Sequence, residues 1–206
     1  MSSFGDAIAV SLPYWWVEET SKIPEFVPSI DAQMSLVNQF ARLNMEHNTG
    51  GPFAAAVFER DSGRFVTMGL NRVVECACSS AHAEVVALSH AQKILKTYDL
   101  GAQSLPAHQL VVNWLPCAMC FGAVVWSGVR HLVIAGSGPE LEDITGFDEG
   151  PRHPDWRKEL ERRKISVDEG RGREEAICVF RDFAKSRRLV YNGRNGDNVS
   201  KSYQSY

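Results

Sequence analysis

Two short motifs constrain this chain more than any other feature. The first is His-Ala-Glu at residues 82–84, and the second is Pro-Cys-Ala-Met-Cys at residues 116–120. His82, Cys117 and Cys120 offer one imidazole and two thiolates, a ligand set typical of zinc. A structural zinc normally has a fourth protein ligand, whereas a catalytic zinc keeps that position for water. The two motifs therefore predict a catalytic zinc site and a hydrolytic reaction.

Other interpretations of the motifs are weaker. A lone Cys-x-x-Cys also occurs in thioredoxin-like redox proteins, and a lone His-x-Glu is close to noise. Cys76 and Cys78 could complete a closed four-ligand site with cysteines of the second motif. A ligand pair one residue apart is, however, tighter than the usual spacing in zinc sites. We therefore interpret Cys76 and Cys78 as loop thiols near the entrance of the site.

The length and composition fit one folded domain. A chain of 206 residues with 44% hydrophobic content is long enough for a single core. No apolar run approaches the ~20 residues needed to span a bilayer, and no signal peptide is evident. The five cysteines, an odd number, suit a reducing cytoplasm better than a disulfide framework. We expect an N-terminal extension over 1–30, the catalytic domain over 31–190 and a polar C-terminal tail over 191–206.

Charge is divided unevenly along the chain. Residues up to 151 carry a net charge of −8 and those from 152 onward carry +5, which gives the overall −3. A basic C-terminal third could hold the phosphates of a nucleic acid. Acidic and basic residues alternate there, however, as expected for solvated helix faces. We favour solvated faces and expect no nucleic acid partner.

Hydrophobic periodicity predicts alternating helices and strands. Two short apolar runs joined by Asp-Ser-Gly at residues 61–63 have the pattern of a β-hairpin. Ser79 or Ser80 can cap the helix that follows. The strands are expected at 53–58, 64–70, 109–115, 131–135 and 165–167. The helices are expected at 31–47, 82–95, 116–126, 155–163 and 174–188.

The predicted helix starts give the metal site a physical basis. Cys117 and Cys120 are three residues apart on one helix, so both sulfurs can reach one ion. The positive end of a helix dipole also favours thiolate over thiol. Glu84 lies about 200° around the helix from His82, so the two side chains can border one pocket only near the frayed helix start.

These residues carry a resemblance to a known family. The histidine and cysteine motifs match the zinc deaminase signature. The chain resembles the cytidine deaminase superfamily from about residue 31 to 190, and most closely the bacterial-type guanine deaminases. The resemblance also rests on Gly-Gly-Pro-Phe at 50–53, Asn71, Cys-Phe-Gly-Ala at 120–123 and Gly-Phe-Asp-Glu-Gly at 146–150. It implies a three-layer α-β-α fold with a central mixed five-stranded sheet flanked by helices.

The resemblance also implies roles for individual residues. Phe53 would stack on a free nucleobase, Asn71 would hold it, and the backbone of Ala83 would bond to it. Glu84 would move protons between the zinc-activated water and the base, and Glu149 would be a second proton shuttle to the amine. Guanine would become xanthine with release of ammonia; amino-triazines such as ammeline are further candidate substrates.

Two tryptophans complete the expected substrate contacts. Trp114 precedes the second motif, and Trp156 is an apolar candidate for closing the site. Leu115 stands where the family usually has glutamate, so we expect a different pocket floor there. Relatives are commonly dimers, which implies a homodimer here.

Two further functions stay open at this point. The chain could be a tRNA adenosine or a cytosine or cytidine deaminase, or a zinc-stabilised binding module without turnover. Glu149 in its Gly-Phe-Asp-Glu context favours a free base over tRNA. Glu84 argues against a non-catalytic module, because a structural zinc site has no use for an unligated acid.

Overall fold

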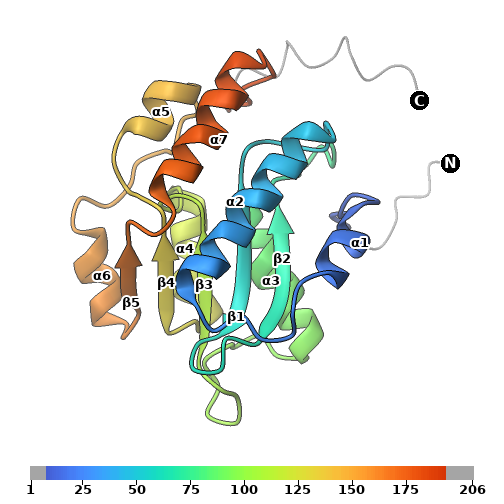
Figure 1. Ribbon diagram of the computed structural model, residues 1–206. Helices are drawn as coiled ribbons and strands as arrows, with labels where there is room; N and C mark the ends of the chain where they lie inside the picture. The colour runs from blue at the N-terminus through green and yellow to red at the C-terminus, as the bar shows by residue number, and fades with distance from the viewer. Residues whose placement is uncertain (1–7, 194–206) are drawn as a thin grey trace, which may run out of the picture.

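A five-stranded mixed sheet forms the centre of the protein in the computed structural model, which describes residues 8–193. The strand order is β2-β1-β3-β4-β5 (Figure 1). β1 is antiparallel to both β2 and β3, whereas β3, β4 and β5 run parallel to one another. The strands are β1 (Ala54–Glu59), β2 (Phe65–Leu70), β3 (His108–Val112), β4 (His131–Ile134) and β5 (Ser166–Glu169).

Helices cover both faces of this sheet, which confirms the expected three-layer α-β-α fold. In Figure 1, α2 and α7 lie in front of the sheet, and α3 and α4 lie behind it. α1 lies beside β2, and α6 beside β5. The helices are α1 (Trp16–Ser21), α2 (Ile30–Glu46), α3 (Ala83–Leu95), α4 (Ala118–Ser127), α5 (Glu140–Thr145), α6 (Trp156–Arg162) and α7 (Arg173–Lys185).

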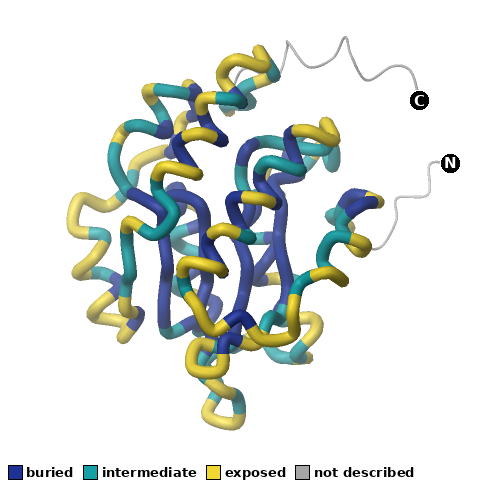
Figure 2. Tube along the Cα trace, in the orientation of Figure 1, coloured by how far each residue is buried: buried dark blue, intermediate teal, exposed yellow. Residues whose placement is uncertain are grey.

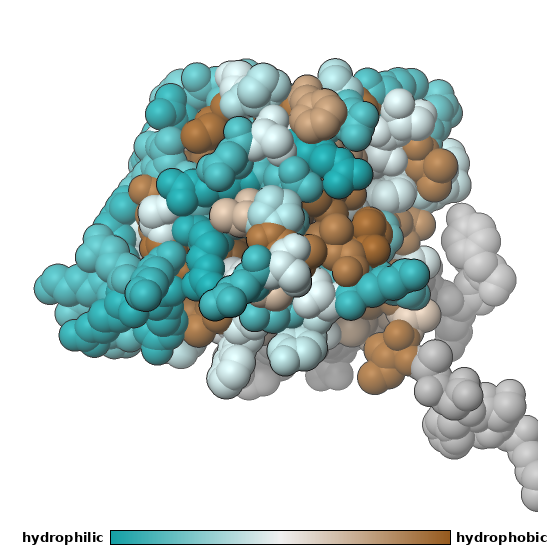
Figure 3. All heavy atoms as spheres, turned by 90° about the horizontal axis from the view of Figure 1, so that it is seen from below, coloured by the Kyte–Doolittle hydropathy of each residue, from teal (hydrophilic) through white to brown (hydrophobic). Residues whose placement is uncertain are grey.

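The central strands are buried on both faces. All five residues of β3 and all four of β4 are buried, as are the first five residues of β1. Figure 2 shows this continuous buried layer between exposed helix faces. Strands covered on both sides read as near-continuous apolar runs rather than alternating patterns. Seen from below, the surface is largely hydrophilic, with apolar side chains gathered near the centre of the view (Figure 3).

One glycine sets the distance between the sheet and the metal-bearing helix α3. A Cβ atom added to Gly69 of β2 would lie 2.4 Å from both the carbonyl oxygen of Ala83 and the amide nitrogen of Ala87. Real Cβ atoms do not approach other atoms this closely. The first turn of α3 therefore lies against the strand at backbone contact distance.

The predicted elements agree with the structure apart from three corrections. The strand predicted over 109–115 ends at Val112, because the following residues leave the sheet to line a cavity. The N-cap of α3 is His82, so the predicted cap by Ser79 or Ser80 is wrong. Two six-residue helices, α1 and α5, were not predicted. Both are too short for a clear hydrophobic period.

The N-terminal segment packs against the domain. The carbonyl of Glu25 accepts from the amide of Phe65 at 2.9 Å, and the amide of Val27 donates to Gly63 at 2.8 Å. Trp15 is 4% exposed and belongs to the main hydrophobic core. Within residues 8–193, none of the helices has the length and apolar character needed to cross a membrane.

Candidate active site

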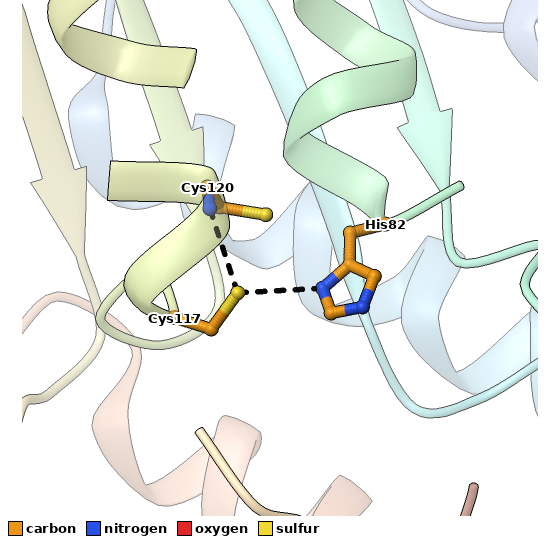
Figure 4. A group of neighbouring side chains, drawn as sticks. All are labelled: His82, Cys117 and Cys120. Atoms are coloured by element: carbon orange, nitrogen blue, oxygen red, sulfur yellow. Dashed lines mark hydrogen bonds between the residues drawn. The ribbon is translucent and has the colours of Figure 1, made fainter. Parts of the chain in front are cut away.

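Two helix starts bring three metal-ligating side chains together. His82 is the N-cap of α3, Cys117 is the N-cap of α4, and Cys120 lies in the first turn of α4. Their ligand atoms all lie within 4.8 Å of one another. Figure 4 shows the imidazole of His82 facing the sulfur of Cys117, with 3.5 Å between Nδ1 and Sγ. The two sequence motifs, far apart in the chain, thus form one group.

The surroundings of these sulfurs favour a metal-binding thiolate. The Cys117 sulfur accepts a hydrogen bond from the backbone amide of Cys120 at 3.5 Å, as an N-cap acceptor does. Hydrogen bonding from Cys120, and then from His82, lowers the pKa of the Cys117 thiol to about 4. The same bond with Cys117, together with burial, raises the pKa of the Cys120 thiol. These contacts favour the thiolate form of Cys117, which is the form that binds a metal.

The donor set fits a zinc ion with an open coordination position. One imidazole and two cysteines are the three protein ligands of zinc deaminases. Among residues 8–193, the group of side chains able to hold a metal contains neither Cys76 nor Cys78. Cys78 instead lies near Ser80, with 3.3 Å between Sγ and Oγ, on a partly exposed loop. This arrangement agrees with their interpretation as loop thiols.

Glu84 is buried beside the metal group. It is the second residue of α3 and lines the same cavity as His82. Burial, followed by the negative charge of Cys117, raises the pKa of its carboxyl group. Because His82 caps the helix in an extended backbone conformation, the two side chains are not held to the ~200° separation of a regular helix. Both can therefore face one cavity.

A cavity of about 160 Å³ opens in front of the metal group. Side chains from the metal helices, from the ends of β1, β2 and β3, and from two loops form its walls. The lining residues are Phe53, Asn71, Ser79, His82, Glu84, Val112, Trp114, Leu115, Cys117, Leu141, Phe147, Asp148, Glu149, Tyr191, Asn192 and Gly193.

One wall combines an aromatic face with an unsatisfied amide oxygen. Phe53 packs edge-on against Phe147, with ring centroids 5.1 Å apart. The side-chain nitrogen of Asn71 donates to the hydroxyl of Tyr191, whereas its Oδ1 is buried without a hydrogen-bond partner. A buried acceptor of this kind is costly unless a ligand or water satisfies it. The wall therefore offers a flat apolar contact and an acceptor for an N–H group.

Glu149 closes the cavity from a different segment of the chain. Its carbonyl accepts from the amide of Ala118 at 3.0 Å, which attaches the 146–150 loop to the start of α4. Burial, then the negative charges of Cys117 and Glu84, raise the pKa of the Glu149 carboxyl to about 8. Arg152 opposes this shift. Glu149 can therefore carry a proton near neutral pH, as a general acid must.

Of the remaining predicted contacts, the structure places one at the cavity and two outside its lining. Trp114 is buried and lines the cavity, as expected. Ala83 is buried at the start of α3 and is not among the lining residues. Trp156 lies outside the cavity, because the chain after Gly150 passes Pro116 on its way to α6. It lines a second cavity of about 130 Å³, separated from the first by Leu115, which borders both.

The beginning of the expected C-terminal tail lines the cavity, a position that the sequence did not predict. Asn192 accepts from the amide of Asp148 at 3.0 Å and donates to the carbonyl of Gly146 at 3.1 Å. Tyr191 contacts Phe147, with 5.1 Å between ring centroids, besides its bond with Asn71. No local sequence pattern marks these two residues. The rest of the tail, 194–206, lies outside the described residues.

Comparisons with known proteins agree with this geometry. Residues 29–136 match the family described as the cytidine and deoxycytidylate deaminase zinc-binding region. A solved structure of guanine deaminase from Nitrosomonas europaea is 47% identical, with a TM-score of 0.83, and covers 88% of this chain and 98% of its own. The protein NE0047, solved with 2,6-diaminopurine, is also 47% identical, with a TM-score of 0.84, and covers 92% of this chain and 98% of its own.

Curated relatives include deaminases of two kinds. Guanine deaminase of Bacillus subtilis is 32% identical over 116 residues, which are 56% of this chain and 69% of the relative. A tRNA-specific adenosine deaminase of Buchnera aphidicola is 28% identical over 147 residues, 70% of this chain and 87% of the relative. The names of these two relatives specify different substrates, guanine in one and adenosine in tRNA in the other.

Proposed function

The chain belongs to the cytidine and deoxycytidylate deaminase zinc-binding family, and on that premise we propose that it converts guanine and water to xanthine and ammonia. The observation that carries this proposal is a pair of buried carboxyl groups, Glu84 and Glu149, in one cavity that His82 and Cys117 also line. The cavity suits a free base, because Tyr191 and Asn192 line it and bond to Asn71 and to the 146–150 loop.

His82, Cys117 and Cys120 would hold the zinc ion. When zinc is bound, it would lower the pKa of its water to near neutrality. The side chain of Glu84 takes the proton of the attacking water and returns it to the base, because it is the acid nearest to the ligands on α3. Its raised pKa keeps it able both to accept and to release a proton.

The opposite wall orients the base and its leaving group. The ring of Phe53 packs against the flat face of the base, and Asn71 Oδ1 accepts a ring N–H that satisfies its lone pairs. Glu149, protonated because of its raised pKa, donates to the departing amine. The oxygen of one water enters at the ring carbon, and one of its protons reaches a ring nitrogen through Glu84. The amine takes one proton from Glu149 and leaves as ammonia, and the proton of the added hydroxyl returns to Glu149, which leaves xanthine.

The charge distribution supports a free base rather than a nucleic acid. In the basic C-terminal third, Arg162 and Arg163 both pair with Glu159, and Arg171 pairs with Asp168. These arginines are engaged in surface ion pairs, which makes them less available to phosphates. We therefore propose that nucleic acid is not a partner. A cytoplasmic location stays a proposal that rests on the odd number of cysteines.

We also propose that the protein is a homodimer that pairs through the outer face of α4. This helix has no charged residue, yet Met119 is 41% and Trp126 is 85% exposed. A helix that is apolar all round needs a partner on each side. Light scattering should give twice the chain mass of 22.9 kDa, and Trp126→Lys should shift it to the monomer. A monomeric wild type would contradict this proposal.

Ammonia release from a substrate panel tests the function itself. We expect zinc-loaded protein to release ammonia from guanine faster than from ammeline, cytosine, adenine or structured tRNA. The activity on guanine should not depend on salt, whereas binding to tRNA would weaken steeply as salt increases. Robust turnover of tRNA or cytosine, with none of guanine, would overturn the proposal.

A further inference from the structure

Asn44, a residue outside the cavity, ties together two of the segments that form its base-binding wall. These segments are residues 50–53, which end at Phe53, and Asn71 after β2. We propose that Asn44 is a positioning residue for base recognition. The inference rests on the proposed function for the identity of the base, but its geometric part stands on the structure alone.

Both polar atoms of the Asn44 side chain form hydrogen bonds. It is completely buried near the C-terminal end of α2. Its Nδ2 donates to the carbonyl of Gly51 at 3.0 Å and to the carbonyl of Asn71 at 3.0 Å. Its Oδ1 accepts from the hydroxyl of Thr49 at 3.0 Å. Two of these bonds go to the wall segments, and the third goes to Thr49, which directly precedes the 50–53 segment.

The segments held by Asn44 meet at contact distance. The amide of Asn71 donates to the carbonyl of Phe53 at 3.1 Å, so the two residues that face the base are also bonded to each other. A Cβ atom on Gly50 would lie 2.0 Å from the Asn71 carbonyl oxygen and 2.5 Å from Asn44 Nδ2. Only glycine fits there. The close packing of Asn44 and the Asn71 carbonyl thus explains why the Gly-Gly-Pro-Phe motif has glycine at position 50.

The N-terminal segment braces the same loop from outside. The indole nitrogen of Trp15 donates to the hydroxyl of Thr49 at 3.1 Å. The side chain of Arg72 donates to the carbonyl of Thr49 and, at 2.9 Å, to the carbonyl of Ser11. This hydrogen-bond chain connects the extension to Asn44 and through it to the wall.

Loss of Asn44 should therefore weaken binding more than chemistry. Glu84 on α3 and Glu149 on the 146–150 loop make no hydrogen bond with Asn44, so proton transfer keeps its geometry. The carbonyls of Gly51 and Asn71 would lose their shared donor, and Phe53 and Asn71 would no longer be held in register. Small misplacements of positioning groups have large kinetic effects.

Asn38 provides a matched control. It is also a buried asparagine of α2, but its Nδ2 donates to the carbonyl of Gly172 at 3.1 Å and to Glu175 at 3.3 Å, on the side facing α7. Asn44→Ala should raise KM for guanine about tenfold with kcat changed less than about threefold. Asn38→Ala should lower thermal stability and leave KM unchanged. Zinc content should equal that of the wild type in both.

Hydrogen exchange separates this inference from the proposed function. Amides in peptides covering 49–55 and 70–73 should exchange about tenfold faster in Asn44→Ala than in Asn38→Ala, whatever the substrate is. If Asn44→Ala does not fold, Thr49→Val, which keeps the shape and removes the hydroxyl, should give the same two changes to a smaller degree. If the wild type is inactive on guanine but the difference in hydrogen exchange is present, only the proposed guanine deaminase function is contradicted. Equal exchange in the two asparagine variants, or an unchanged KM, overturns the role of Asn44.

Discussion

The metal group and the base-binding wall are built in different ways. The metal group comes from two helix starts, and each motif places its ligands through local geometry alone. The wall is assembled from the 50–53 loop, Asn71, the 146–150 loop and the segment at 191–193, which meet only in the folded protein. The difference teaches that the reaction type depends on local spacing, whereas substrate recognition depends on tertiary contacts.

Removal of the metal should have the largest effect and should leave the wall intact. Cys117→Ser or chelation should reduce ammonia release to background, because no remaining residue replaces the metal. Acidification should release zinc, since its ligands must be deprotonated to bind and protons compete with the ion. Zinc per chain measured across pH 4–8 checks the direction. Retained zinc at wild-type affinity in Cys117→Ser would contradict the ligand assignment.

Loss of the acid beside the metal should rank second. Glu84→Gln should keep about one zinc per chain and lose at least ~100-fold in kcat, the low end for a general acid or base. Kinetics and metal analysis on the same preparation test this. Near-wild-type turnover in the zinc-loaded variant would remove Glu84 from proton transfer.

Loss of the acid on the wall side should have a similar or smaller effect. Glu149→Gln should lower kcat by about 100-fold with KM nearly unchanged, because the proton that it donates is needed only as the amine leaves. Since the acidic form is the active one, guanine turnover in the wild type should fall as the pH rises through the pKa of Glu149. Normal turnover by the variant would reduce Glu149 to a loop acid.

The smallest effect should come from the cover of the wall. Tyr191→Phe removes the hydroxyl that accepts from Asn71, and a net hydrogen bond is worth about 0.5–1.5 kcal/mol. We expect KM for guanine to rise about three- to tenfold with kcat almost unchanged. An effect on kcat as large as that of Glu149→Gln would show that Tyr191 takes part in the reaction. The contrast between the metal group and the base-binding wall would then fail.

The sequence predicted the sheet better than the cavity. The hairpin at residues 61–63 is confirmed, and Gly63 has the positive φ, 70°, that this turn requires. All five strands occur, and in β1 to β4 the apolar runs reflect burial directly. Residues 113–115 were predicted as strand for the same reason, since cavity walls are as apolar as sheets.

The contacts that close the site could not be predicted, because they join distant segments. The bond between Tyr191 and Asn71 spans 120 positions, and the bonds of Asn192 to the 146–150 loop leave no periodic pattern. Trp156 was expected at the cavity since it follows the Gly-Phe-Asp-Glu motif closely. Only the path of the chain past Pro116 shows that it faces another space.

The close approach at Gly69 bears on how this enzyme can change over evolutionary time. Any side chain there would push α3 from the sheet, and His82 with it, so position 69 is closed to neutral drift. Substitutions in the base-binding wall do not move the three metal ligands in this way. New specificities can therefore arise by substitutions in the wall while the metal centre is inherited unaltered, and a mutant library aimed at new substrates should vary the wall and hold Gly69 constant.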